Sequence, residues 1–81
     1  MRKRVTPVNE ETFGSRLKRL RTRAGMTRPQ LGGLVGRSGE WVKALETGRI
    51  LPPRLPMMVR LAEALRADDL AELTGDERLA M

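Results

Sequence analysis

Three observations predict an all-α fold for this chain, a compact bundle of five helices. Leucine dominates the apolar residues, with twelve Leu against six Val and Ile together, while only one Phe and one Trp are present. Leucine favours helices, whereas β-branched and aromatic residues favour strands. Apolar residues also recur at spacings of three and four, and glycine or proline separates these segments. Finally, 81 residues are enough for one small domain with its tails.

The first helix is predicted over residues 11–24, after a segment without apolar periodicity. The apolar side chains of this helix fall on one stripe, at spacings of four, three and four: Phe13, Leu17, Leu20 and Ala24. Asn9 or Thr12 can cap its start, and Gly25 ends it. We expect residues 1–10, with three consecutive basic side chains, to form a flexible basic arm.

A second, short helix is predicted after a capping box. The Thr27 hydroxyl can accept a hydrogen bond from the Gln30 amide while the Gln30 side chain reaches back, and Gly36 ends the helix two turns later. Its interior contains Gly32 and Gly33, each of which costs about 1 kcal/mol relative to Ala. A glycine inside a helix makes sense where another backbone comes so close that it leaves no room for a side chain. We therefore expect a tight helix–helix contact at Gly32.

The third helix is predicted over about residues 39–47, capped by Ser38. Only Gly36 and Arg37 separate the second helix from this cap, and two short helices joined by such a brief turn form a helix-turn-helix. Three prolines between positions 52 and 56 then enforce a loop.

Two further helices complete the predicted domain. They are expected over about residues 56–66, and from Asp68 or Asp69 to near Gly75. The domain would therefore cover residues 11–75, leaving residues 76–81 as a C-terminal tail.

Charge and missing residue types narrow the possible functions. The net charge is +6; residues 1–28 carry nine basic and two acidic side chains, whereas residues 61–81 carry two basic and six acidic ones. Such a polarised chain presents a positive end to an anionic partner. Cys and His are absent, which removes disulfides, the usual zinc ligands and the commonest general base. We therefore expect no enzyme activity and no cofactor.

No apolar stretch of the chain has the length of a signal peptide's core or of a membrane span. We therefore expect a cytoplasmic protein without a membrane partner.

Short motifs follow one another in a characteristic order between about Phe13 and Leu73. They are Leu17-x-x-Leu20-Arg21, Gly25-Met26-Thr27, Leu31-Gly32, Gly36-Arg37-Ser38, Trp41-Val42-x-x-Leu45-Glu46-x-Gly48, Pro52 and Leu61-Ala62-x-Ala64-Leu65. In their spacing the chain resembles the phage-repressor and Cro-type helix-turn-helix domains, also called the xenobiotic-response-element family. The resemblance implies a transcriptional regulator that lays the helix at about 39–47 in the major groove of double-stranded operator DNA, as a homodimer.

The resemblance also implies roles for individual residues. Those facing DNA bases would be Ser38, Gly39, Glu40, Lys43, Ala44 and Thr47. Those contacting the DNA backbone would be Thr27, Arg28, Arg37, Trp41, Arg49 and Arg54. Arg21 and Glu46 match a pair that forms a partly buried salt bridge in the family.

Gly39 and Ala44 depart from the family pattern, which often places Gln, Arg or Lys at these positions. Direct readout would then fall on Glu40 and Lys43, with the Ala44 methyl available to a thymine methyl. Weaker base-reading side chains leave an alternative function open, a protein-interaction module on the same fold, such as a bridging factor or an antitoxin-like partner.

The oligomer and the extent of the protein also remain open. Leucines near the C-terminal end are candidates for a dimer surface: Leu70, Leu73 and Leu79. The chain could also be the DNA-binding portion of a longer regulator whose C-terminal sensing domain is not part of this sequence.

Overall fold

The computed structural model describes residues 11–75, and these residues form five α-helices and no strand. The helices are α1 (Phe13–Arg23), α2 (Arg28–Leu34), α3 (Gly39–Glu46), α4 (Leu55–Ala64) and α5 (Leu70–Thr74). The predicted all-α class is confirmed. The arm and the tail expected at 1–10 and 76–81 lie outside the described residues. None of the described helices is both long and apolar enough to cross a membrane.

Local capping chemistry sets where four of the five described helices begin, whereas α4 has no side-chain cap and carries a proline in its first turn. The Thr12 side chain caps α1 by accepting a hydrogen bond of 3.0 Å from a backbone amide of the first turn. Thr27 and Gln30 form both halves of the predicted capping box of α2. Ser38 caps α3, and Asp69 rather than Asp68 caps α5. These starts were predictable because each cap depends only on residues within one turn.

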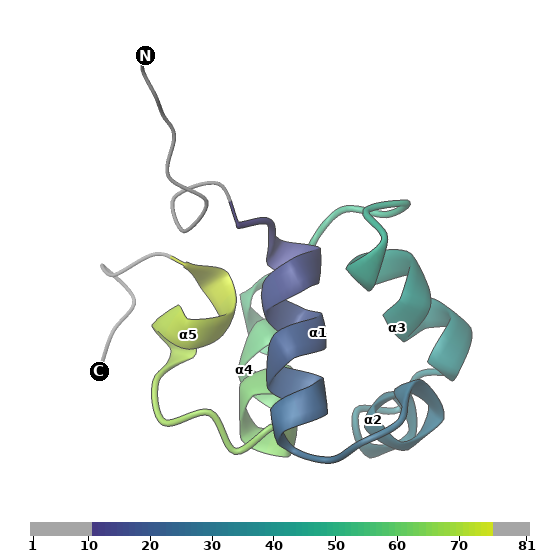
Figure 1. Cartoon of the computed structure of the whole chain (residues 1–81), viewed down its shortest axis with the longest axis horizontal. Helices are drawn as coiled ribbons and strands as arrows, with labels where there is room; N and C mark the ends of the chain where they lie inside the picture. Colours follow the sequence, from purple (N-terminus) through teal and green to yellow (C-terminus); the bar gives the residue numbers. More distant parts are fainter. Residues whose placement is uncertain (1–10, 76–81) are drawn as a thin grey trace.

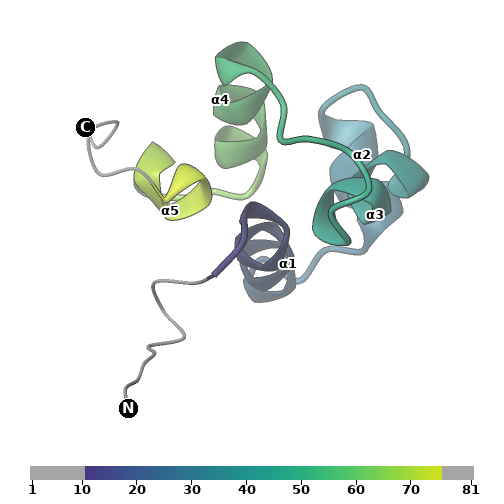
Figure 2. The ribbon, with the colours of Figure 1, turned by 90° about the horizontal axis from the view of Figure 1, so that it is seen from above.

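Helix α1 lies in the middle of the molecule. In Figures 1 and 2, α2 and α3 lie on one side of it, and α4 and α5 lie on the other. The closest helix pairs agree with this arrangement, because α1 contacts both α3 and α5 while α2 packs against α3. Helix α3 therefore rests on α1 and α2 from one side and leaves its other side to solvent.

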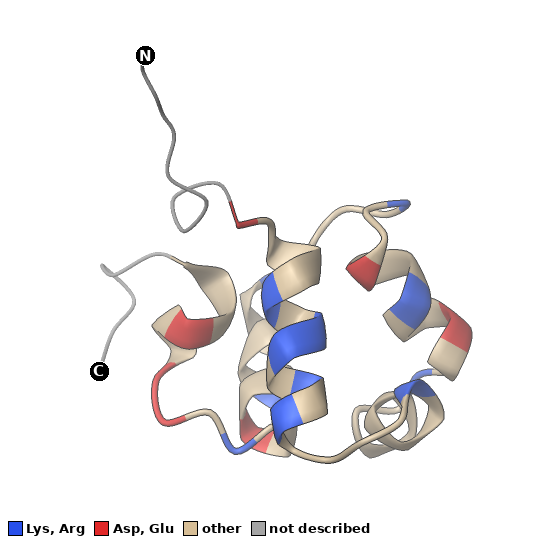
Figure 3. Cartoon of the chain, viewed as in Figure 1, with Lys and Arg blue, Asp and Glu red and all other residues tan. Residues whose placement is uncertain are grey.

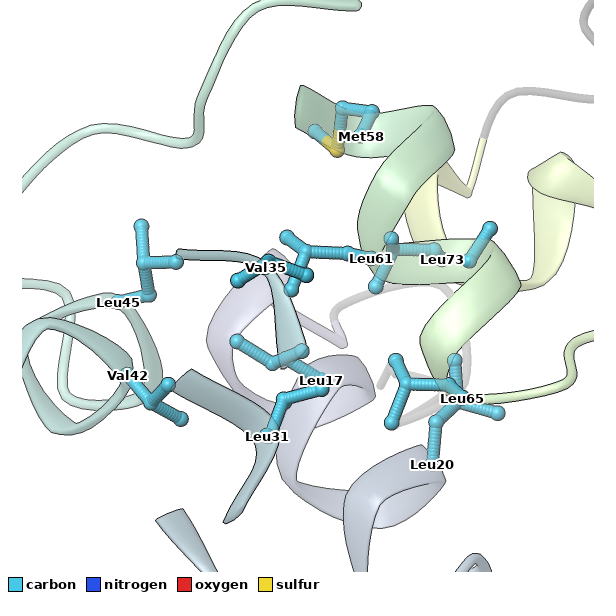
Figure 4. Close-up of a cluster of buried hydrophobic side chains, with 11 residues drawn as sticks. Leu17, Leu20, Leu31, Val35, Val42, Leu45, Met58, Leu61, Leu65 and Leu73 are labelled. Atoms are coloured by element: carbon cyan, nitrogen blue, oxygen red, sulfur yellow. The ribbon is translucent and has the colours of Figure 1, made fainter. Parts of the chain in front are cut away.

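An aliphatic core joins all five helices (Figure 4). Each fully buried leucine in it contributes about 2 kcal/mol through the removal of apolar surface from water. The buried side chains are Leu17, Leu20, Leu31, Val35, Val42, Leu45, Met58, Leu61, Ala62, Leu65 and Leu73. Leu73 is wholly buried, which corrects its expected place in a dimer surface.

The close contact expected at Gly32 is present. A Cβ atom built on Gly32 would lie 2.5 Å from the carbonyl oxygen of Ser38, so any side chain would force α2 and α3 apart. The neighbouring Gly33 has no atom within 4 Å of such a Cβ. Between the helices, Gly36 has a φ of +77°, a left-handed conformation that side chains other than glycine rarely adopt. Gly32 and Gly36 therefore allow α2 and α3 to pack closely.

Candidate nucleic-acid interface

The solvent side of α3 consists of three exposed side chains, Glu40, Lys43 and Thr47, which we call the α3 stripe. Their spacing of three and then four residues puts them on one face of the helix. On the opposite face, Val42 and Leu45 are buried in the core. The fold thus turns the α3 stripe outward and fixes its direction through the core contacts of the same helix.

Two of the six residues expected to face bases offer no side chain to a ligand. Ala44 is only 5% exposed, so the expectation that its methyl is open to a thymine methyl is wrong. Gly39 is half-buried, and a Cβ there would lie 3.0 Å from both Cγ and N of Pro29. A side chain at position 39 would therefore press against the first turn of α2.

Two hydroxyls of the predicted set are engaged at the ends of α3. Ser38 Oγ accepts a hydrogen bond of 3.1 Å from the amide of Trp41, and Thr47 Oγ1 donates one of 2.9 Å to the carbonyl of Lys43. Glu40 and Lys43, by contrast, have no side-chain hydrogen bond or ion pair with any residue between 11 and 75. They are the two exposed side chains of α3 whose polar groups have no partner among residues 11–75.

Exposed cations surround α3. Arg37, Lys43, Arg49 and Arg54, which we call the outer cations, are all exposed. No carboxylate within the described part of the chain pairs with any of them. Figure 3 shows one of these basic residues on α3 and another at the tip of the loop that follows it.

Trp41 connects two of the outer cations. The guanidinium carbon of Arg37 lies 5.2 Å from the centroid of the Trp41 ring, a cation–π distance. Arg37, Trp41 and Arg54 line one pocket of about 400 Å³ between α3, the loop and the start of α4. The indole is half-buried against the core, so its exposed part and the two arginines form one surface.

A second pocket, of about 360 Å³, lies between the first turns of α2 and α3. It is lined by Pro29 and by five of the residues predicted to contact DNA: Arg28, Ser38, Gly39, Glu40 and Lys43. The close packing of α2 on α3 therefore brings residues from both helices to one surface.

The structure contains the pair of Arg21 and Glu46 implied by the resemblance. Arg21 Nε donates to Glu46 Oε2 at 2.6 Å, and Arg21 Nη2 donates to Oε1 at 3.2 Å. Arg28, expected only as a DNA contact, is a third member, because its Nε donates to Glu46 Oε1 at 3.0 Å. The Glu46 side chain is 1% exposed, so two arginines neutralise one buried carboxylate. This cluster ties α1, α2 and α3 together.

Opposing effects set the protonation of Glu46. Burial raises the pKa of its carboxyl, but the hydrogen bonds and positive charges of Arg21 and Arg28 lower it more. The net result is a pKa below the ordinary value of 4.5. Glu46 is therefore ionised at neutral pH and holds both guanidinium groups in place.

The start of α2 differs from expectation at Thr27. Its backbone N–H, expected to meet a phosphate, already donates to the Gln30 side chain at 2.8 Å. Arg28 keeps 32% of its side chain exposed while its Nε binds Glu46. A contact between Arg28 and a DNA phosphate stays a prediction, and one that depends on the Glu46 cluster.

Arginines of α1 are used within the fold. Arg16 donates to the carbonyls of Leu73 and Thr74 at 2.9 Å each, which ties the end of α5 to α1. Arg19 pairs with Glu11 and Arg23 with Glu72 on the surface. No local signal in the sequence marks a partner 57 residues away, as Leu73 is for Arg16.

No group of three or more acidic side chains that could hold a metal ion occurs between residues 11 and 75.

Comparison with known families matches residues 12–74 to the helix-turn-helix domain, a stretch that includes all five described helices. Searches of curated proteins and of solved structures returned no match. The matched stretch is most of the chain, and α2 and α3 pack as the two helices of this motif. The protein therefore belongs to the helix-turn-helix domain family.

Proposed function

We propose that this protein binds double-stranded DNA by laying α3 in the major groove and thereby regulates transcription. The observation that carries the proposal is the set of outer cations, Arg37, Lys43, Arg49 and Arg54, exposed on and beside α3 without a carboxylate partner among residues 11–75. Membership of the helix-turn-helix family supports it, since the second helix of this motif reads the major groove in well-studied members.

Dimensions and charge agree with this function. The major groove is about 12 Å wide, and an α-helix with its side chains is about 10 to 12 Å across. A helix placed there brings cations at its flanks next to both phosphate backbones. Phosphate contacts position a protein on DNA, and contacts with base edges supply its specificity. The outer arginines, Arg37, Arg49 and Arg54, would do the first, and Glu40 and Lys43 of the α3 stripe the second.

We further propose that the protein acts as a homodimer and without enzymatic activity. A single α3 offers only Glu40 and Lys43 to the bases, so one domain would read few base pairs. Two copies related by a two-fold axis would read two half-sites about 34 to 36 Å apart. Sedimentation equilibrium with and without duplex DNA tests this step: a mass of two chains on the duplex supports the dimer, and one chain per duplex contradicts it.

The main test of the proposal is the salt dependence of duplex binding. Each neutralised phosphate contributes about −0.9 to the slope of log affinity against log salt. Arg37, Arg49 and Arg54, with Arg28 as a fourth contact, predict a slope of about −3.6 per protomer. Fluorescence anisotropy with a labelled duplex measures it. A slope near zero, or no binding at low salt, would contradict DNA binding by this surface.

A second candidate function is a protein-interaction module, and exposed apolar side chains favour it. Leu51 is 86% exposed, Leu34 61% and Leu55 51%, more than solubility alone would favour in a small domain. Replacing Lys43 and Arg54 by Ala should weaken DNA binding strongly, whereas Leu51→Ser should weaken a protein contact and leave DNA binding unchanged. These variants separate the candidates better than Arg28→Ala, which also removes a ligand of Glu46.

A further inference from the structure

The side chains left on the outer face of α3 carry opposite charges and opposite hydrogen-bonding roles. Gly39 has no side chain and packs against Pro29, Ala44 is buried, and the hydroxyls of Ser38 and Thr47 each make a hydrogen bond at a helix end. The two exposed charged groups on this face are a carboxylate at Glu40, which only accepts hydrogen bonds, and an ammonium at Lys43, which only donates them. Both line the pocket between the first turns of α2 and α3.

Base edges in the major groove differ in the partners that they offer to these two groups. Cytosine presents the N4 amino group, a donor that suits a carboxylate. Guanine presents two acceptors, O6 and N7, and thymine presents O4, all of which repel a carboxylate. Adenine offers a donor at N6 but carries the N7 acceptor beside it. A carboxylate therefore favours cytosine, and an ammonium favours guanine.

We infer that each half-site contains a C·G pair whose cytosine contacts Glu40, together with a guanine that contacts Lys43. This inference rests on the proposed DNA binding through α3 and specifies the bases that it selects. The two side chains are three residues apart, so their Cβ atoms lie about 5 to 6 Å apart on the helix face. Successive base pairs are about 3.4 Å apart along the duplex. Glu40 and Lys43 thus reach the same base pair or two neighbouring ones.

Glu40 gives selectivity and lowers general affinity. Its carboxylate enters a groove bordered by phosphates, so it opposes binding to every sequence. Only the hydrogen bond to cytosine compensates for that repulsion, so a duplex without a cytosine at this position binds with the full electrostatic cost of the carboxylate. Removal of the charge should therefore raise affinity for unselected DNA and reduce discrimination at the same time. A merely solvated carboxylate would not change the base preference.

Selection from a pool of duplexes with about 20 random base pairs, two helical turns, tests the inference. The full chain, Glu40→Gln, Lys43→Ala and a control, Glu63→Gln, are each carried through the selection. Glu63 is an exposed carboxylate on α4 with no side-chain partner among residues 11–75, so its substitution makes the same charge change away from α3. Circular dichroism confirms that each variant keeps its helices.

We expect the unmodified chain to enrich cytosine at one position of the half-site and guanine opposite it or beside it, each by about fivefold or more. Glu40→Gln should replace cytosine by adenine, because glutamine bonds to N6 and N7 of adenine. It should also tighten binding to the unselected pool. Lys43→Ala should lose the guanine preference, and Glu63→Gln should keep the complete base profile.

Enrichment of other bases, or the same profile with Glu40→Gln as with the unmodified chain, would overturn the inference while leaving DNA binding in place. Binding to the pool without any base preference would do the same. Absence of binding by the unmodified chain at low salt would instead contradict the proposed function itself. The two failures are therefore distinguishable in one experiment.

Discussion

The arginines of α1 and the basic residues around α3 have different roles in the same small molecule. Of the four arginines of α1, each has a partner inside the protein: two pair with surface carboxylates, one binds carbonyls near the end of α5 and one binds Glu46. The outer cations have no carboxylate partner among residues 11–75. Counting charge along the chain assigns more positive charge to the first third. Only the structure shows where that charge is already neutralised.

Glu46 lies at the boundary between the two regions. Its carboxylate holds Arg21 of α1 and Arg28 of α2, so it belongs to the folded scaffold and also places one arginine near the proposed DNA surface. Substitutions at this residue should therefore affect stability first and DNA binding second.

The largest predicted effect is that of Glu46→Ala. Removing one member of a buried charge cluster leaves Arg21, 13% exposed, without its partner, and should lower the free energy of unfolding by about 3 to 5 kcal/mol. Urea denaturation followed by circular dichroism measures the change. The control is Glu72→Ala, which breaks the exposed pair with Arg23 and should cost only about 0.5 kcal/mol. If the two substitutions lowered the free energy of unfolding equally, the buried Glu46 cluster would be no more important for stability than the exposed pair of Glu72 and Arg23.

The pH dependence of stability should follow the same carboxylate. The folded-state pKa of Glu46 lies below 4.5, so its contribution is complete above about pH 4.5 and is lost as the pH falls further. The difference in unfolding free energy between the unmodified chain and Glu46→Gln should be constant at neutral pH and shrink in acid. Urea titrations between pH 7 and pH 3 test this. A difference that grows in acid would mean that the two arginines do not stabilise the ionised form.

The packing of α2 on α3 should respond to two neighbouring glycines in opposite ways. Gly32→Ala places a methyl against the backbone of Ser38 and should destabilise the protein by about 2 kcal/mol. Gly33→Ala enters open space and should stabilise it by about 1 kcal/mol, because alanine favours the helix. Thermal unfolding of both variants provides the measurement. If both substitutions were neutral, α2 and α3 would not approach as closely as described.

A smaller effect should separate the two sets of basic residues in DNA binding. Replacing Arg49 or Arg54 by Ala should each reduce the magnitude of the salt slope by about 0.9, since each removes one phosphate contact. Arg19→Ala and Arg23→Ala should leave the slope unchanged, because these arginines pair within the protein. The slopes come from anisotropy titrations at several salt concentrations. Equal losses from both sets would contradict the division between the two regions.

Local features of this fold could be predicted from the sequence. The caps at Thr27 and Ser38 could be predicted because each depends only on residues within the next turn. The close approach at Gly32 could be predicted because a glycine inside a helix destabilises the helix unless another backbone needs the space. Leucine spacing was sufficient to place the five helices within about two residues, because an amphipathic stripe needs a helix to reach the core. The pair of Arg21 and Glu46 followed from family resemblance and is present.

Features that depend on tertiary distances could not be predicted. Arg28 joins Glu46 across 18 positions, and Arg16 reaches the end of α5 across 57. The sequence around an arginine does not show whether its guanidinium is solvated or bonded to a distant residue. Only the three-dimensional structure, which brings distant segments together, distinguishes the two cases. Gly39 was interpreted as a weak base-reading position, and the structure gives the physical reason for the glycine in the contact with Pro29. Ala44 was placed on the wrong side of α3, because its burial depends on neighbouring segments.

In the proposed complex the α3 stripe, and not the arginine-rich surface of α1, faces DNA. Nuclear magnetic resonance titration of the labelled protein with a short duplex tests it most directly, residue by residue. We predict that the largest amide shifts fall on α3 and on the loop through Arg54, with Glu40 and Lys43 among them and with small shifts on α5. Largest shifts along Arg19 and Arg23, with α3 unchanged, would contradict the account.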